Sequence, residues 1–455
     1  MTPLQSGNIF SSGSVVSDTL KYGIRKTGYV RELFQEQPEC ELLSVSSVIG
    51  LSGVYLRNPF VFRDQVLVDP KGIFSKDDKL LFGELQRFLG NSTISDPRTH
   101  KEGVERHRKG RKIVNAAAIP SKQKLNAFCQ IIDHHLDQLD RRLEQHIAQR
   151  RNPRIIDELT HYTLGVISQI FFGFDNINSL FRNACPNAEL SDFIDAKRII
   201  IRYISKKLFR AGLDNPLKHS KYLRSLTLIN DIALWIEQNS TSVFLASLRQ
   251  RFPDNQPYRV DQVKGLIFAG LHTTATSLVM LLHHVDQSRH SPTNVEQLFL
   301  ERTEDEVFIK NMFREALRLS PPQPQIGRTA AQDTELIING ARFFLEAGTR
   351  IAFDIGFANH DFMYWPEASL KMPLAAYYPD RFVGLEQQRL PDCNVFAGGS
   401  SSCSGKMLAY LEVERFIKKL LPKYKFRFLS EPELYDWFIL AYPKNRFLQA
   451  RVMRR

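Results

Sequence analysis

The stretch Phe396-Ala-Gly-Gly-Ser-Ser-Ser-Cys403-Ser-Gly405 decides how the rest of this 455-residue chain is interpreted. It places a lone cysteine in a glycine- and serine-rich loop, directly before an amphipathic stretch from Lys406 to about Leu421. Such a loop can aim backbone N–H groups at the sulfur, and the following helix adds the positive end of its dipole. Both effects favour the thiolate, the form of cysteine that binds a metal. Taken alone, a cysteine in such a loop is more often a buried free thiol.

The composition predicts a protein with a large core, because 43% of the residues are hydrophobic and 32 are phenylalanine. We expect no transmembrane anchor, since no apolar run reaches the ~18 residues that span a bilayer. The N-terminus lacks the pattern of a secretory signal, and its scarcity of acidic residues is only a weak indication of an organellar transit segment. We therefore expect a soluble, cytoplasmic protein.

The five cysteines are scattered and never form a CxxC pair, which argues against a disulfide framework and against a zinc site. The net charge is +12, with basic residues clustered at 105–112 and 451–455. No nucleic-acid motif accompanies these clusters, so we expect no nucleic-acid partner. Docking of an acidic protein, or neutralisation of an acidic cofactor, explains the charge equally well.

The pattern along the chain predicts a mainly α fold with a small β portion, in one large domain over residues 1–455. Helical periodicity dominates at about 76–325 and 403–421, with the longest helices expected at 123–150 and 260–285. Strands are expected at about 49–70 (including 60–62 and 65–70), at 325–355 and in the C-terminal tail. No repeat or long linker divides the chain, which favours a single domain.

A second motif is the pair Glu315 and Arg318, whose i,i+3 spacing puts both side chains on one helix face. On the surface such a pair would contribute little. Apolar neighbours indicate instead that this helix is packed into the body, where a buried pair needs further partners. Arg381, about 20 residues before Cys403, could supply one.

A third motif lies in the long helix expected at 260–285. Gly270 costs about 1 kcal/mol relative to alanine in a helix interior, and close approach of a flat ligand is one contact that could offset this cost. The neighbouring His272, Thr273 and Thr274 put polar groups into an apolar helix. A kinked core helix with a satisfied histidine would give the same pattern.

A fourth motif is the pair His107 and Arg111, which share a helix face at i,i+4 and could hold an anionic group. A solvated basic face explains this pair as well.

Together and in this order, the four motifs resemble those of the cytochrome P450 family of haem-thiolate proteins. The cysteine loop is similar to the family's F-x-x-G-x-R-x-C-x-G at Phe396, Gly399, Cys403 and Gly405. Glu315 and Arg318 match its E-x-x-R pair, and Arg381 matches the arginine that completes the network. Ala269, Gly270, Thr273 and Thr274 match its oxygen-binding helix, and His107 with Arg111 resembles its propionate-binding helix.

The resemblance implies a P450-like single domain that binds haem b, with Cys403 as the axial thiolate on the iron. It implies that the haem also contacts residues that bind its propionates or leave room for its faces and for O2: His107, Arg111, Ala269, Gly270, Arg328, Phe396, Gly399 and Gly405. Thr273 and His272 would handle protons at the bound oxygen. Glu315, Arg318 and Arg381 would form a structural network.

The resemblance further implies a monooxygenase that inserts one oxygen atom from O2 into a hydrophobic small molecule, such as a terpenoid, a sterol-like compound or another secondary metabolite. Electrons would come from a donor such as a ferredoxin with its NAD(P)H reductase, docked on the basic face behind Cys403, and the protein is expected to be a monomer. The substrate would lie against the oxygen-binding helix, residues 325–327 and residues 437–440.

Two positions depart from the family pattern. Ser401 stands where the family carries arginine, so haem retention would depend on the other basic residues. His272 stands where most members carry an acid, although sterol 14α-demethylases have a similar Ala-Gly-x-His-Thr stretch; a histidine can also move protons. A peroxygenase or isomerase that needs no redox partner stays open as an alternative. A non-catalytic haem sensor is disfavoured by Thr273.

Overall fold

The computed structural model describes residues 9–11, 27–45, 53–69, 72–75, 81–96, 101–209, 216–432, 434–437, 440–443 and 448–455. The helices of the first half are α2 (Thr27–Glu36), α3 (Pro59–Val61), α4 (Leu81–Leu89), α5 (Lys101–Ala118), α6 (Lys122–Ala148), α7 (Ile155–Phe172), α8 (Ile177–Ala184), α9 (Leu190–Phe209) and α10 (Pro216–Asn239). Those of the second half are α11 (Val243–Arg251), α12 (Gln256–Ser288), α13 (Val295–Glu301), α14 (Glu306–Leu319), α15 (Ile355–Ala358) and α16 (Lys406–Leu420).

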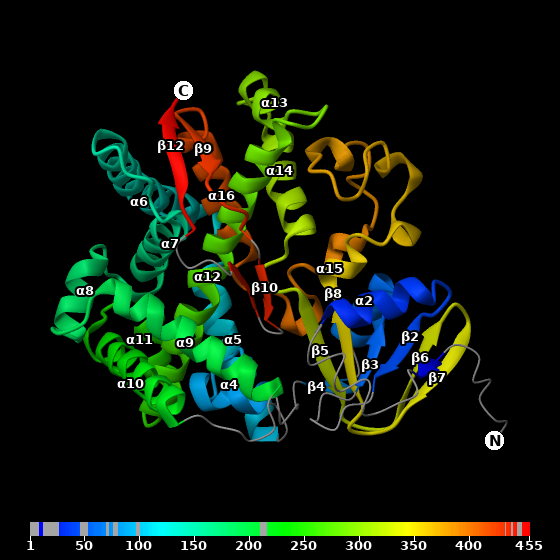
Figure 1. Ribbon diagram of the computed structural model, residues 1–455. Helices are drawn as coiled ribbons and strands as arrows, with labels where there is room; N and C mark the ends of the chain where they lie inside the picture. Colours follow the sequence, from blue (N-terminus) through cyan, green and yellow to red (C-terminus); the bar gives the residue numbers. More distant parts are fainter. Residues whose placement is uncertain are drawn as a thin grey trace.

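The strands form one larger sheet and three two-stranded pairs. The six-stranded sheet has the order β1 (Ile9–Ser11), β2 (Leu42–Val45), β3 (Gly53–Leu56), β8 (Arg350–Asp354), β5 (Gln325–Ala330) and β4 (Phe74–Ser75). The pairs are β6 (Thr334–Ile338) with β7 (Ala341–Leu345), β9 (Tyr424–Phe428) with β12 (Ala450–Arg454), and β10 (Leu434–Trp437) with β11 (Leu440–Pro443). Figure 1 shows the larger sheet on one side of the molecule and helices α4 to α12 on the other. The predicted mainly α fold with a small β portion is confirmed.

The long central helix α12 organises the helical side, where it packs against α7, α10 and α14. Asn255 caps its first turn by accepting a hydrogen bond from the Tyr258 N–H, and a proline stands in that turn. Among the described residues, α12 is the one helix with the length and hydropathy to cross a membrane, so the expectation that no stretch is apolar enough was wrong. Within its most apolar window 78% of the residues are buried in the protein, which makes α12 a core helix.

The expected helices at 123–150 and 260–285 correspond to α6 and α12 and are confirmed. The strands expected at 60–62 and 65–70 were wrong, because Pro59–Val61 is helical and Phe62–Leu67 forms a π-helical turn, η1. The Asn58 side chain accepts hydrogen bonds from the N–H groups of Phe60 and Val61 and thereby starts a helix there. Of the predicted segment at 49–70, the part that is a strand is Gly53–Leu56.

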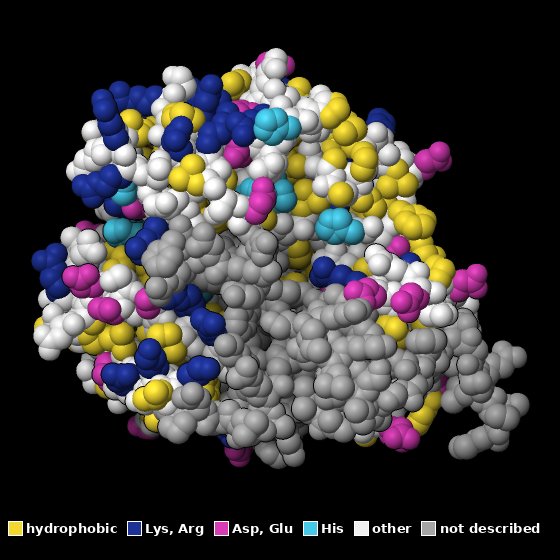
Figure 2. Space-filling view, in the orientation of Figure 1, with side chains coloured by type: hydrophobic (Ala, Val, Ile, Leu, Met, Phe, Trp, Pro, Cys, Tyr) yellow, Lys and Arg dark blue, Asp and Glu magenta, His cyan; other side chains and the backbone are white. Residues whose placement is uncertain are grey.

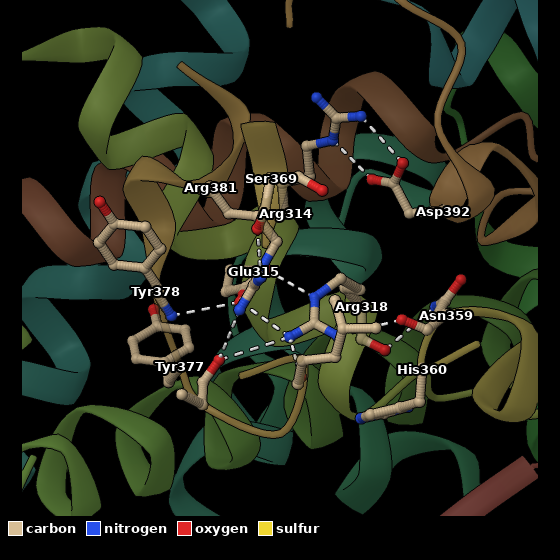
Figure 3. A network of polar contacts seen from close by, with 12 residues as sticks. Arg314, Glu315, Arg318, Asn359, His360, Ser369, Tyr377, Tyr378, Arg381 and Asp392 are labelled. Carbon is tan, nitrogen blue, oxygen red and sulfur yellow. Dashed lines mark hydrogen bonds and ion pairs between the residues drawn. The ribbon is translucent and has the colours of Figure 1, made fainter. Parts of the chain in front are cut away.

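The Glu315 side chain joins α14 to the chain that precedes the cysteine loop (Figure 3). Its Oε2 lies 2.7 Å from Nε of Arg318, and its Oε1 lies 3.1 Å from Nε of Arg381. Both guanidinium groups are fully shielded and donate further to carbonyl oxygens, including those of Asn359 at 3.1 Å and Ser369 at 2.6 Å. The network therefore satisfies two buried cations with one carboxylate and several carbonyl groups.

Figure 2 shows Lys and Arg side chains gathered over the region of β9 and β12, in the upper left of the view. Many of them have acidic partners on neighbouring elements. Lys423 lies 2.8 Å from Asp140, and Arg427 lies 2.8 Å from Glu296. Part of the basic C-terminal cluster therefore ties the last strand pair to the helical body.

Candidate functional site

A cavity of about 320 Å³ lies where α12, β5 and the cysteine loop meet. Its wall contains the predicted site residues Arg111, Ala269, Gly270, Thr273, Arg328, Phe396, Cys403 and Gly405. Most of the remaining wall is apolar, with Leu85, Ile94, Val114, Phe171, Phe268, Leu317 and Ile326 among its residues. The fold thus brings residues from three of the four sequence motifs, together with Arg328, to one hollow, while Glu315 and Arg318 are not among the described residues that line it.

The cysteine loop is held by backbone contacts that require its glycine. The Cys403 N–H donates to the Phe396 carbonyl oxygen at 2.9 Å, which closes the loop. Gly399 has a left-handed backbone with φ 57°, and a Cβ there would overlap the Leu67 carbonyl oxygen and lie 2.7 Å from Cα of Val68. The loop is therefore pressed against the end of η1, and Gly399 provides this close approach rather than one on the sulfur side.

Cys403 lines the cavity and is exposed to it. Desolvation by the protein atoms packed around the sulfur raises the pKa of the Cys403 thiol, while hydrogen bonding from the Gly405 and Lys406 N–H groups and the charges of Arg111 and Lys406 lower it. The net shift is upward, so the loop alone does not favour the thiolate as the sequence had indicated. Burial outweighs the helix end because the charged form loses its hydration.

Gly405 follows the cysteine and lines the same cavity. A Cβ on it would point into the space beside the sulfur, 3.9 Å from Sγ. A side chain at this position would fill the place where a flat group bonded to the sulfur has to lie.

Two cations line the cavity beside the cysteine loop. Arg111 donates from Nη2 to the Ser402 carbonyl oxygen, and burial lowers its pKa while the neighbouring Cys403 raises it. Arg328 is buried and its Nη1 lies 2.7 Å from the Gly327 carbonyl oxygen. Ser401 also lines the cavity. Arg111 and Arg328 are therefore the positions at which the carboxylates of a bound cofactor would meet a positive charge.

His107 is not among the described residues that line the cavity. It is buried, and its Nε2 lies 3.1 Å from the Thr93 carbonyl oxygen. The i,i+4 spacing correctly placed His107 and Arg111 on one helix, α5. Their side chains nevertheless contact different segments: His107 faces the loop at 90–96, and Arg111 faces the cysteine loop.

On the opposite wall, α12 contributes Ala269, Gly270 and Thr273. The Thr273 hydroxyl donates to the Ala269 carbonyl oxygen at 2.7 Å, one turn earlier. A Cβ on Gly270 would overlap Cδ1 of Ile167 and lie 3.1 Å from its Cγ1. The cost of glycine in this helix is therefore offset by close packing of α12 on α7.

His272 is buried and absent from the described residues that line the cavity. Burial holds its pKa well below the usual value, and the charges of Lys197 and Arg198 on α9 lower it further. The imidazole is therefore neutral at physiological pH. It lies on the α9 side of α12, behind the wall that carries Thr273.

Lys197 is a residue that the sequence did not reveal. It is fully buried on α9, and its Nζ lies 2.7 Å from the Phe268 carbonyl oxygen. Burial lowers the pKa of Lys197 well below its usual value. The amine therefore contacts α12 one turn before Gly270, at a place where no sequence pattern predicts a polar group.

Glu412 is a second residue that sequence reasoning missed. It lines the cavity on α16, is 2% exposed, and its Oε2 has no hydrogen-bond partner among the described residues. Burial raises its pKa well above the usual value and so favours the protonated carboxyl. Helical spacing from Gly405 through Ala409 could have placed Glu412 on this face.

The loop at 90–96 forms another part of the wall through Thr93 and Ile94. It is fixed to the first half of α12, where Asp261 accepts from the Asn91 N–H at 2.8 Å and Gln262 accepts from the Thr93 N–H at 3.2 Å. The polar start of α12 therefore sets the position of this loop.

The cavity has the donor set of a haem-thiolate site. Within the described parts of the chain, no group of three or more His, Cys, Asp and Glu residues could hold a metal ion. The uncrowded space beside Gly405 and the cations Arg111 and Arg328 fit a flat, acidic macrocycle. The side chains of residues 437–440 lie outside the described residues.

Comparison with known proteins gives one family and a set of distant relatives. The profile of the family described as Cytochrome P450 matches residues 62–447. Cytochrome P450 52-M1 of Starmerella bombicola is 27% identical over 241 residues, which cover 48% of this chain and 44% of that protein. Putative cytochrome P450 137 of Mycobacterium tuberculosis is 27% identical over 290 residues, covering 59% of this chain and 56% of that protein.

Thromboxane-A synthase of Mus musculus is 29% identical over 198 residues, covering 39% of this chain and 35% of that protein. The chain therefore spans about half the length of the first of these relatives and less of the synthase.

Proposed function

Because the chain belongs to the cytochrome P450 family, and so to a family of haem-dependent monooxygenases, we propose that it inserts one oxygen atom from O2 into a hydrophobic small molecule bound beside Cys403. The observation that carries the proposal is the single cavity lined both by the Cys403 loop and by Thr273 on α12. A thiolate ligand to a haem iron favours O–O cleavage, and a hydrogen-bonding hydroxyl on the opposite wall supports oxygen activation there.

We assign the cofactor as haem b, which residues of this cavity would hold. Cys403 would bind the iron through its thiolate, and Gly405 adds no side chain beside the sulfur. Arg111 and Arg328 would neutralise the propionates, with Ser401 adding a hydroxyl in place of a charge. When bound, the haem would supply the redox chemistry that splits O2. His107 acts indirectly in this proposal: its side chain contacts the Thr93 carbonyl oxygen and so positions the loop at 90–96 beside the cavity.

Thr273 is the proton-handling group of the proposal, since its hydroxyl lies on the cavity wall. That hydroxyl donates to the Ala269 carbonyl oxygen and can accept a hydrogen bond in return. His272 acts only as an uncharged relay behind this wall, because burial keeps its imidazole neutral. The apolar side chains around Thr273 exclude water and favour a hydrophobic substrate.

An electron-donor protein such as a ferredoxin is proposed to dock on the face behind the cysteine loop. A second hollow lies there, lined by the cations Lys406, Lys310 and Arg63 and by Arg314, which is paired with Asp392, and Glu414 lines it too. Basic groups around a shallow surface attract an acidic partner. We propose a cytoplasmic monomer, which fluorescence localisation and sedimentation of the full chain would test.

The first prediction concerns the reduced carbon-monoxide difference spectrum. We expect a thiolate-type band near 450 nm for the wild type, and we expect Cys403→Ser to abolish it because serine cannot supply the thiolate. The matched control is Cys393→Ser, a cysteine of the neighbouring segment Pro391–Asn394 that lines the second hollow. A haem-loaded wild type without this band, or a Cys393→Ser variant that loses it, would contradict the assignment.

A rearranging or peroxide-using enzyme is the second candidate function. One relative is named a synthase, and His272 stands at the sequence position where most members of the family carry an acid. Turnover with hydrogen peroxide or a lipid hydroperoxide, without reductase, separates the two candidates. Product formation that depends on NAD(P)H and a donor protein supports the monooxygenase.

A further inference from the structure

Two basic side chains are buried at the contact between α9 and α12. Lys197 of α9 is 0% exposed, and His272 of α12 is 1% exposed. The Lys197 amine lies 2.7 Å from the Phe268 carbonyl oxygen and 3.5 Å from that of Ile267, and its Nζ is 5.0 Å from the centre of the Phe268 ring. A neutral amine still has N–H donors for such carbonyl groups, so this contact does not require a charged lysine.

The electrostatic surroundings favour the uncharged forms of both groups. Burial holds the pKa of His272 well below its usual value, and the charges of Lys197 and Arg198 lower it further. Arg198 itself pairs with Asp195 at 2.7 Å. The helices α10 and α4 also pack against α9, but their described charged side chains do not act on the pKa of Lys197, which burial lowers. No described carboxylate therefore compensates a proton on Lys197.

Helix α9 lies at the surface, where it can move without dismantling the core. Its residues 191, 192, 195 and 202 are exposed, whereas Phe193 and Ile200 on its other face are fully buried. It packs mainly against α10 (Figure 1). Local openings of such elements cost less free energy than global unfolding. The α9–α12 contact can therefore open while α9 stays on α10.

Opening of the α9–α12 contact would return both groups to water. The usual pKa is 10.5 for lysine and 6.5 for histidine. In neutral solution the open form therefore carries a proton on Lys197 that the closed form lacks, and below about pH 6.5 it carries one on His272 as well. Each such proton favours the open form by about tenfold per unit fall in pH, until the pH reaches the lowered pKa of the closed form.

We propose that the contact between α9 and α12 is an acid-sensitive switch, which is closed while Lys197 and His272 are unprotonated and opens as they take up protons from water. The switch is separate from the proposed oxygenation, because none of its steps involves Cys403 or a cofactor. It nevertheless acts next to the cavity, since Phe268 lines the wall and its carbonyl oxygen is the group that Lys197 contacts. Acid would therefore loosen this part of the wall from behind.

Amide hydrogen exchange of the full-length, haem-loaded protein tests the switch. Peptides from α9 are followed by mass spectrometry at several pH values, and dividing by the intrinsic exchange rate at each pH gives the opening equilibrium. We expect the opening of α9 to increase about tenfold per unit fall in pH between about pH 9 and 7, and more steeply below about pH 6.5. Peptides from the buried helix α7 should show a smaller opening at every pH, because their exposure requires global unfolding.

Variants assign each proton to its side chain. Lys197→Met keeps the apolar stem and removes the amine, so the opening should become independent of pH between about pH 9 and 7. Lys197→Leu repeats the measurement if methionine disturbs folding. His272→Phe should keep this dependence and lose the steeper rise at lower pH. The matched control is Arg198→Met, on the same helix but paired with Asp195 at the surface, which should behave as the wild type.

An opening of α9 that does not change with pH in the wild type would overturn the inference. So would a pH dependence that survives in both Lys197→Met and Lys197→Leu, or one that is lost in Arg198→Met, because a different group would then carry the proton. Equal opening of α9 and α7 at every pH would also contradict it, since the whole protein would then respond to acid and not this contact.

Discussion

Lys197 is a buried amine, and its burial affects the stability of this fold. The amine lies among apolar side chains, 5.0 Å from the centre of the Phe268 ring, and its close polar contacts are the carbonyl oxygens of Phe268 and Ile267. These carbonyl groups lie within the continuous helix α12, whose backbone hydrogen bonds form without the amine. The contacts of the amine are therefore additional to the bonds that hold the helix. The uncompensated burial of Lys197 should therefore lower the stability of the protein.

We predict that Lys197→Met raises the free energy of unfolding by about 1–3 kcal/mol, because methionine keeps the apolar stem and removes the buried amine. The pKa of Lys197 is lowered in the folded state from 10.5, so between the two pKa values only the unfolded chain holds the proton. Stability from this group therefore rises as pH rises towards about 10.5, and the variant should lose that slope. Urea unfolding at several pH values measures both effects.

The control is Arg198→Met on the same helix, whose partner Asp195 lies 2.7 Å away at the surface. Its effect should stay within about 0.5 kcal/mol. If Lys197→Met were destabilising, the amine would contribute more to α12 than its contacts indicate.

Among the elements, the cysteine loop depends on one glycine more than its composition suggests. We predict that Gly399→Ala destabilises the protein by about 2–4 kcal/mol, because alanine adds left-handed strain and a clash with the Leu67 carbonyl oxygen. Gly384→Ala separates the two causes, since Gly384 has φ 78° but nothing within 4 Å of an added Cβ. It should cost only about 1 kcal/mol. Equal losses in the two variants, measured by denaturant unfolding, would refute the role of the clash.

The helices and strands also show which parts of the fold can be predicted from the sequence. Prolines and caps mark the ends of α6 and α12, so their extents were predictable. The β-branched and aromatic run after Pro59 read as a strand, because the cap that makes it helical depends on one Asn58 side chain. The residues of the four motifs were identifiable from spacing. Their orientation was not, since the side of α12 on which His272 lies is set by packing against α9.

Sequence patterns also do not predict which side chains of different elements come into contact, because packing between the elements decides this. Gly270 was identified as unusual, but the atom that needs the space is on Ile167, in a different helix. Burial, and with it the raised pKa of Cys403, likewise depends on every element around the loop.

At the scale of the whole molecule, the Glu315 network connects the helical body with the segment that leads to Cys403. We predict that Glu315→Gln lowers the free energy of unfolding by about 3–5 kcal/mol, because it leaves two buried guanidinium groups without a counter-charge. Glu306→Gln at the exposed start of the same helix is the control, since Glu306 pairs with Lys418 at 3.1 Å on the surface. Its effect should stay within about 0.5 kcal/mol.

Equilibrium unfolding in urea, followed by circular dichroism, measures the Glu315 and Glu306 variants side by side. Haem retention provides a second measurement, and the Glu315 variant should lose haem faster because the cysteine loop is less firmly held. A Glu315→Gln protein as stable as the Glu306 control would show that the carbonyl groups alone satisfy Arg318 and Arg381.

The Glu315 network also has a consequence for the timing of biosynthesis. Glu315 and Arg381 are separated by 66 residues, which a ribosome adding about 5–20 residues per second needs roughly 3–13 s to make. Until then α14 carries a carboxylate and an arginine that lack their later partners. Further along, Tyr424 must meet Asp140, which lies 284 residues earlier. The contacts between the two ends of the described chain therefore form only after nearly all of it has been translated, so the last strands complete the core after the helical body has left the ribosome.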